Sequence, residues 1–214
     1  SRVVFGHGLG QRDPGGPDRK RSRRGIPLSA AVLGAGNWGT TVALHIHALG
    51  HRTALWEFNA SLAREMIERR ENRTYLPGFP TPGDLLVTSD LAEAVVGRDL
   101  IVFVVPSFAM RGTARALRET GAVSRDAIFV SLSKGLEHET VMTMTGIIET
   151  ELKGFRTAAL SGPCIASEVA SGLPTTIVSA SGDPETARIV QDAFMTPLLR
   201  VYTSDDPLGV QLGG

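Results

Sequence analysis

The sequence predicts an α/β fold built on an open, doubly wound, mostly parallel sheet. Short apolar runs alternate with helical segments from residue 30 to the end of the 214-residue chain, and this alternation is typical of parallel sheets. Residues 100–105 are apolar at every position, as expected for a strand that is covered on both faces. Right-handed crossovers would place helices on both sides, with ligands bound beyond the carboxyl ends of the strands.

The individual elements follow from the spacing of apolar residues and from capping signals. Apolar stripes at helical spacing predict helices, such as the one formed by Trp38, Val42, Ile46 and Leu49 before the stop at Gly50. The predicted helices cover residues 37–49, 60–70 (capped by Asn59), 108–120, 140–152 and 184–194. The predicted strands cover residues 30–33, 53–56, 100–105, 127–132, 157–160, 175–179 and 199–202.

The first part of the chain differs in composition from the rest. Residues 1–30 hold seven Lys or Arg, two Asp or Glu, six Gly and three Pro, without hydrophobic periodicity. We therefore expect residues 1–29 to be a disordered, basic, Gly/Pro-rich tail and residues 30–214 to be one nucleotide-binding domain. The basic run 19–24 is interpreted as a solvated tail, with a nucleic-acid patch, a sorting patch or a transit peptide as alternatives.

Composition excludes several functional classes. Lys plus Arg equals Asp plus Glu at 22 each, so nucleic acid is not an expected partner. No apolar run approaches the 18 residues of a membrane span. A single cysteine excludes an internal disulfide and indicates a reducing, cytoplasmic setting. No metal site is expected, since His45 and His47 lie two residues apart on different faces of a helix.

A glycine-rich loop follows the first predicted strand and opens the first helix. Its sequence, Gly34-Ala35-Gly36-Asn37-Trp38-Gly39, has the G-x-G-x-x-G spacing of a Rossmann-like dinucleotide-binding loop. Gly34 permits the tight turn, Gly36 lets a pyrophosphate approach the backbone, and Gly39 lets the helix pack closely. The free N–H groups of the helix would face the phosphates. A plain tight turn, which is the alternative, does not need all three glycines.

The acidic residue at the end of the second predicted strand bears on the choice of cofactor. Glu57 stands where a carboxylate accepts hydrogen bonds from the adenine-ribose hydroxyls of NAD and repels the 2′-phosphate of NADP. We therefore expect NAD, with NADP as the less favoured cofactor. The alternative, in which Glu57 faces solvent one residue out of register, stays open.

Several sequence strings together resemble NAD(P)-dependent glycerol-3-phosphate dehydrogenase. They are GAGNWGT (34–40), YLPG (75–78), FVVPS (103–107), SKGLE (133–137), SGPCIASE (161–168) and GVQLGG (209–214). The resemblance implies an oxidoreductase that interconverts dihydroxyacetone phosphate and sn-glycerol 3-phosphate with NAD(P)H and feeds glycerophospholipid synthesis. It also implies a helical C-terminal domain that is absent from this chain, and a general-acid lysine beyond Gly214, so the fragment alone is expected to be inactive. A homodimer is the expectation for the full-length enzyme.

The resemblance also implies roles for particular residues. Lys134, Gly162 and Cys164 match substrate-binding positions, although Thr, Ser or Asn is commoner than Cys at the last one. The implied cofactor contacts are Gly34, Gly36, Asn37, Trp38, Gly39, Glu57, Phe58, Lys134 and Ala166. Many bacterial relatives have Arg or His in place of Phe58, which favours NAD here. Two alternatives stay open, a non-catalytic dinucleotide-binding module and another dehydrogenase of the hydroxyacid type.

Overall fold

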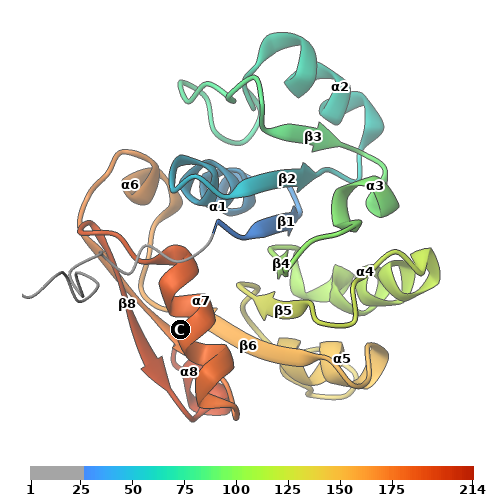
Figure 1. Cartoon of the computed structure of the whole chain (residues 1–214), viewed down its shortest axis with the longest axis vertical. Coiled ribbons are helices and arrows are strands. Elements are labelled where there is room, and N and C mark those ends of the chain that lie inside the picture. The colour runs from blue at the N-terminus through green and yellow to red at the C-terminus, as the bar shows by residue number, and fades with distance from the viewer. Residues whose placement is uncertain (1–26) are drawn as a thin grey trace, which may run out of the picture.

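Strands run through the middle of the molecule, with helices on either side, in the computed structural model, which describes residues 27–214 (Figure 1). The strands are β1 (Ser29–Leu33), β2 (Arg52–Trp56), β3 (Leu86–Thr88), β4 (Leu100–Phe103), β5 (Ile128–Ser131), β6 (Arg156–Ser161), β7 (Thr175–Ala180) and β8 (Leu199–Ser204). The helices are α1 (Asn37–Ala48), α2 (Ala60–Arg69), α3 (Leu91–Val95), α4 (Ser107–Thr120), α5 (Met144–Glu151), α6 (Ala166–Ala170), α7 (Pro184–Phe194) and α8 (Pro207–Leu212). The predicted alternation of strands and helices is confirmed.

The sheet has the doubly wound order that the sequence predicts. Its strands are arranged β3-β2-β1-β4-β5-β6-β7-β8, and the first six in this order pair in parallel. The chain leaves β1 toward β2 on one side and later enters β4 on the other, so the order reverses between β1 and β4. In open α/β sheets, ligands bind at such a switch point.

One strand pair departs from the parallel pattern. β7 pairs antiparallel with β6, whereas β8 is parallel to β7. The connection from β6 to β7 contains only α6, which is five residues long. A parallel crossover needs an element long enough to return across the face of the sheet. The chain therefore turns at the carboxyl edge of β6 and runs back beside it.

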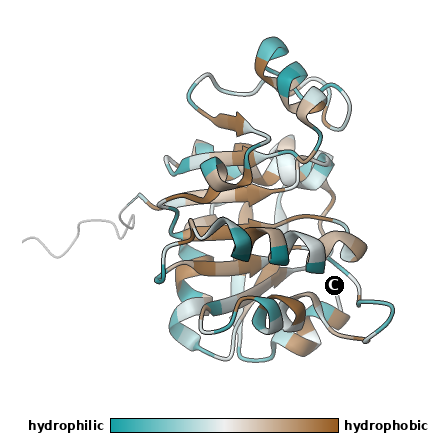
Figure 2. Cartoon of the chain, turned by 90° about the vertical axis from the view of Figure 1, so that its right-hand side faces the viewer, coloured by the Kyte–Doolittle hydropathy of each residue, from teal (hydrophilic) through white to brown (hydrophobic). Residues whose placement is uncertain are grey.

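The two faces of the sheet bury separate sets of side chains. Ala30 and Val32 of β1 belong to a core layer with residues of α1, α2 and α7. Ala31 and Leu33 belong to a second layer with residues of α3, α4 and α5. Side chains alternate along a strand, which explains why these strands are apolar at successive positions. Figure 2 shows this hydrophobic character along the central strands.

Some element boundaries differ from the predicted ones for local physical reasons. β1 starts at Ser29, whose N–H and hydroxyl both bind the Asp99 carboxylate at 2.7 Å. α5 starts four residues later than predicted, because Val141 has a φ of 59° and Thr143 caps the helix instead. The sequence did not indicate β3, α3, α6 or α8, each of which has six residues or fewer. The disordered tail was predicted for residues 1–29, and this end is wrong, because the Leu28 N–H bonds to His51 and Ser29 belongs to β1. Residues 1–26 lie outside the described residues.

None of the helices within residues 27–214 has both the length and the hydrophobicity that a bilayer crossing requires. A cluster of ion pairs joins α4 to α5. Glu151 is 7% exposed and accepts hydrogen bonds or ion pairs from three arginines spaced along α4, which are Arg111 at 2.6 Å, Arg118 at 3.0 Å and Arg115 at 3.2 Å. These contacts, Arg111 first among them, lower the pKa of Glu151 to about 2.

This pKa predicts an acid-sensitive contribution to folding. The carboxyl group titrates at about 4.5 without its partners and at about 2 in the folded chain, so the folded state binds fewer protons in between. The stabilisation is complete above pH 4.5 and is lost as the pH falls toward 2. We expect Glu151→Gln to flatten this part of the pH dependence of the unfolding free energy, measured by urea denaturation. The exposed Glu139→Gln is the control, and equal slopes in both variants would contradict the assignment.

Candidate functional site

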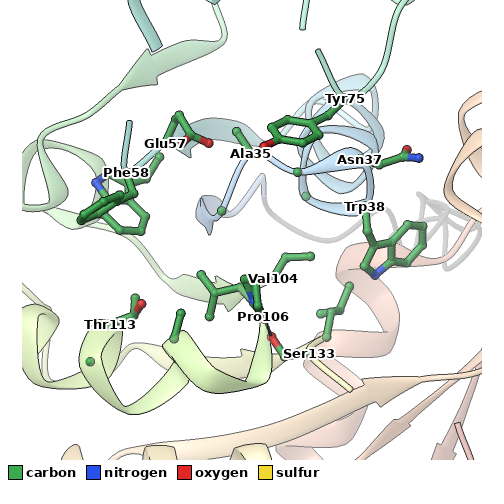
Figure 3. A pocket seen from close by; sticks show the side chains of 18 of the residues that line it. Ala35, Asn37, Trp38, Glu57, Phe58, Tyr75, Val104, Pro106, Thr113 and Ser133 are labelled. Atoms are coloured by element: carbon green, nitrogen blue, oxygen red, sulfur yellow. Dashed lines mark hydrogen bonds between the residues drawn. The ribbon is translucent and has the colours of Figure 1, made fainter. Parts of the chain in front are cut away.

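A cleft of about 1060 Å³ opens at the switch point, beyond the carboxyl ends of β1, β2, β4 and β5. Figure 3 shows Glu57, Phe58 and Tyr75 on one wall, and Pro106, Thr113 and Ser133 on the facing wall. Trp38 stands at one end of the opening. The walls therefore come from elements on opposite faces of the sheet, and the volume is at the upper end of what ligand pockets enclose.

The glycine loop shows the geometry that its spacing predicts. Gly34 has a φ of 108°, and a Cβ there would lie 2.8 Å from the carbonyl oxygen of Val104. A Cβ on Gly39 would overlap the carbonyl oxygen of Gly34. Both glycines are therefore required by close backbone contacts within the protein. No protein atom lies within 4 Å of a Cβ on Gly36, so this residue leaves open space above the loop.

The N-terminus of α1 has the properties of an anion-binding helix end. Gly36 is its N-cap, no side chain caps the first turn, and this turn contains no acidic residue. By contrast, Asn59 caps α2 and Asp183 caps α7 through side-chain oxygens. Free N–H groups and the helix dipole together favour negative charge at this point. The loop and the space over Gly36 fit the pyrophosphate of a dinucleotide.

A buried residue that sequence reasoning missed holds this loop in place. Asn72 has no exposed surface, and its Nδ2 donates hydrogen bonds of 2.7 Å to the Ala35 carbonyl and to Thr40 Oγ1. Its Oδ1 accepts a hydrogen bond from the N–H of Tyr75 at 3.1 Å. The amide thus ties the Tyr75 segment, which lines the cleft, to the glycine loop. The only sequence signal was its place three residues before the YLPG string.

Glu57 and Phe58 follow β2 directly and line the cleft together. The N–H of Asn59 donates a 2.8 Å hydrogen bond to Glu57 Oε1, which orients the carboxylate. Phe58 is 82% exposed and meets Trp56 edge-on, with ring centroids 6.2 Å apart. An acceptor and an exposed aromatic ring therefore stand side by side, as ribose and adenine recognition would require.

Lys134 enters the cleft from the loop that follows β5. Its Nζ donates a 3.1 Å hydrogen bond to the Gly162 carbonyl oxygen, which follows β6. The hydroxyl of the adjacent Ser133 donates to the Val105 carbonyl at 2.6 Å and anchors the loop to the segment that follows β4. The structure therefore brings Lys134 and Gly162 together, although 28 residues separate them in the chain.

The remaining predicted site residues lie at the same edge of the sheet. Asn37 and Trp38 line the cleft. Cys164 and Ala166 follow β6, and neither residue lines the cleft in the described part of the chain. The carbonyl of Ala166 accepts a 3.4 Å hydrogen bond from the hydroxyl of Thr41, which places α6 against α1. Burial raises the pKa of Cys164, so its thiol is neutral near pH 7.

The two histidines of α1 bind different partners. His45 Nε2 lies 2.7 Å from the Phe194 carbonyl, and His47 Nε2 lies 3.1 Å from Asp84. Each ring therefore fastens α1 to a different neighbouring segment. Within residues 27–214 no three His, Cys, Asp or Glu side chains gather in a way that could hold a metal ion.

Comparison with known families decides the identity. Residues 29–187 match the family model described as NAD-dependent glycerol-3-phosphate dehydrogenase N-terminus. This chain belongs to the NAD-dependent glycerol-3-phosphate dehydrogenase family. The resemblance drawn from the sequence strings is thus confirmed.

Relatives in this dehydrogenase family match most of the chain. It is 42% identical over 189 residues to glycerol-3-phosphate dehydrogenase [NAD(P)+] of Fusobacterium nucleatum, and these residues are 87% of this chain and 56% of that protein. The enzyme of the same name from Moorella thermoacetica is 46% identical over 186 residues, which are 87% of this chain and 55% of that protein. The crystal structure of glycerol-3-phosphate dehydrogenase from Coxiella burnetii superimposes with a TM-score of 0.82 at 32% identity, over 88% of this chain and 57% of the other. The chain therefore spans little more than half the length of these dehydrogenases.

The glycine geometry predicts opposite results for two similar substitutions. Gly39→Ala places a methyl group into the Gly34 carbonyl, so we expect a loss at the upper end of the about 1–3 kcal/mol that overpacking costs. Gly36→Ala meets no protein atom and should change the unfolding free energy by less than about 0.5 kcal/mol. Chemical denaturation of both variants measures the contrast. Similar losses at the two positions would show that the loop geometry is wrong.

Proposed function

We propose that this chain is the NAD-binding part of a dehydrogenase that interconverts dihydroxyacetone phosphate and sn-glycerol 3-phosphate and so supplies glycerophospholipid synthesis. The observation that carries the proposal is the uncapped α1 N-terminus, which opens into a dinucleotide-sized cleft in a chain of this family. The named activity of the relatives supports the substrate pair.

The residues present fit the cofactor along the whole cleft. The N–H groups of Gly36, Asn37, Trp38 and Gly39 would hold the pyrophosphate. Gly34, whose own N–H donates to the Trp56 carbonyl at 3.0 Å, would shape the turn. Glu57 would accept hydrogen bonds from the adenine ribose, Phe58 would contact the adenine, and Ala166 would contact the cofactor from α6. NADH, once bound, supplies the hydride for the carbonyl carbon of the substrate.

The chain's own contribution to the chemistry would centre on Lys134. Its ammonium group stands beside the Gly162 carbonyl at the cleft, where a positive charge stabilises substrate phosphate or the oxyanion that develops during reduction. Gly162 leaves no room for a side chain, since a Cβ there would lie 2.9 Å from the Thr176 carbonyl oxygen. Cys164, held neutral, adds a small group with weak hydrogen-bonding capacity to the substrate region.

The expected setting and partners belong to the same proposal. A cytoplasmic location is in line with one free cysteine, Cys164, which is half-buried. A homodimer of the full-length enzyme follows from the family resemblance alone. The phosphorylated triose and glycerol are the expected small-molecule partners, and nucleic acid is not expected.

Cofactor binding by the chain itself tests the proposal most directly. We expect NADH to bind, seen as a change in its fluorescence, and Gly36→Val to abolish binding, because the branched side chain fills the space over the loop. Gly83→Val is the matched control, since a Cβ at Gly83 also meets open space but lies outside the cleft. Undiminished NADH affinity in Gly36→Val would reduce the loop to a structural turn.

The preference for NAD provides a second test. Beside a 2′-phosphate, the Glu57 carboxylate would suffer like-charge repulsion of roughly 1–3 kcal/mol, equal to about a fivefold to 150-fold loss of affinity. We therefore expect a lower Kd for NADH than for NADPH, and we expect Glu57→Ser to remove most of the difference.

Two results would contradict the proposed role of Glu57 in cofactor preference. Equal or tighter binding of NADPH by the native chain contradicts the NAD assignment. A full NADH preference that persists in Glu57→Ser places the discrimination on another residue. Dihydroxyacetone phosphate-dependent oxidation of NADH, measured on the full-length protein, separates a dehydrogenase from a non-catalytic dinucleotide-binding module.

A further inference from the structure

The loop that carries Lys134 is held by an arginine outside the cleft-lining residues. Three residues after Lys134, the Glu137 carboxylate receives two hydrogen bonds from Arg111, with Nε 2.7 Å from Oε1 and Nη2 2.6 Å from Oε2. Such two-point Arg–carboxylate bonds fix orientation as well as distance. The side chains are only 20% and 17% exposed, so solvent screens the pair little.

Arg111 connects this loop to a wall of the cleft. It lies on α4, and Ala109, Gly112 and Thr113 of the same helix line the cleft. Its remaining Nη1 donates to Glu151 of α5 at 2.6 Å. The guanidinium therefore joins three separate segments at one point, and only one of them carries Lys134.

The loop beyond Lys134 contains a strained backbone conformation that contacts with neighbouring residues must stabilise. Val141 has a φ of 59°, a left-handed conformation that is costly for a β-branched residue. The turn around it is closed by hydrogen bonds from Glu137 N–H to the Met142 carbonyl and from Val141 N–H to the Glu137 carbonyl. Both bonds involve Glu137, the residue that Arg111 grips. A strained conformation persists only where neighbouring contacts over-determine it.

General stabilisation of α4 against α5 does not explain this arrangement. Arg115 and Arg118 already join α4 to Glu151. Of the described arginines, Arg111 is the one that pairs with Glu137. Arg111 shares the contact between the helices with these two arginines, and its pairing with the Lys134 loop is the contact that they do not make.

We propose that Arg111 is a positioning residue, which holds the Lys134 ammonium beside the Gly162 carbonyl by fixing Glu137. The role assigned to Lys134 rests on the proposed function. The contact that Arg111 maintains joins two residues of this chain, Lys134 and Gly162. It can therefore be tested separately from cofactor binding.

The sequence offers an unusually clean probe of this contact. The sequence contains three lysines, Lys20, Lys134 and Lys153. The NMR spectrum of a chain labelled with ¹³C at lysine Cε therefore has three side-chain signals. Arg111→Lys keeps the positive charge but loses the pair of hydrogen bonds to the Glu137 carboxylate. We expect the Lys134 signal to move toward the shift of a free lysine, while the Lys153 signal stays in place. We also expect the Kd for NADH to rise about fivefold, the effect of weakening one charge-assisted hydrogen bond.

Arg115→Lys is the matched control, because Arg115 lies on the same helix and binds Glu151 without touching Glu137. Glu137→Gln keeps the size of the side chain and should reproduce the Arg111→Lys shift, which guards against a variant that fails to fold. A Lys134 signal unchanged in both Arg111→Lys and Glu137→Gln, or moved equally in Arg115→Lys, overturns the proposal. Absence of NADH binding by the native chain would instead contradict the proposed function and leave the ligand-free shifts as the deciding result.

Discussion

The close contact between α1 and the first strand is the constraint on which the site depends. Gly39 lies so near the Gly34 carbonyl that no side chain fits between them. This contact brings the start of α1 to the end of β1, directly beside Val104 after β4. The uncapped amides therefore open into the gap between β1 and β4. Gly36 can then remain free of protein contacts, because the glycines on either side of it carry the packing.

The helices differ in whether a side chain caps their N-termini. Side-chain oxygens cap α2, α3, α5, α7 and α8. Among the described helices, α1, α4 and α6 have no such cap, and each follows a parallel strand, β1, β4 or β6 respectively. Backbone donors left without a protein partner must bind water or a ligand. Donors of this kind are thus concentrated where the sheet order reverses and where Lys134 meets Gly162.

Local patterns allowed the strands, the long helices and the glycine loop to be predicted, because each depends on neighbouring residues. The later start of α5 could not be predicted, since it depends on a left-handed turn at Val141, a conformation that is rare for a β-branched residue. The Glu137 residue in this turn also pairs with Arg111, 26 residues earlier in the chain. Asn72 was missed for a similar reason, because its partner Ala35 lies 37 residues away. The antiparallel entry of β7 depends on the length of a connection. Proximity of Lys134 to Gly162 was implied by family resemblance rather than by spacing.

The position of the cleft between the two core layers determines how a bound ligand would affect the stability of the fold. α1 packs in one layer and α4 in the other, and within the described chain these layers meet through the sheet. A molecule in the cleft would touch both helices at once and form a second bridge between the layers. Occupancy would then oppose the local opening of both helices, seen as slower exchange of the amide protons on α1 and α4. Ligand binding would then be linked to unfolding, so that the unfolding free energy rises with ligand concentration.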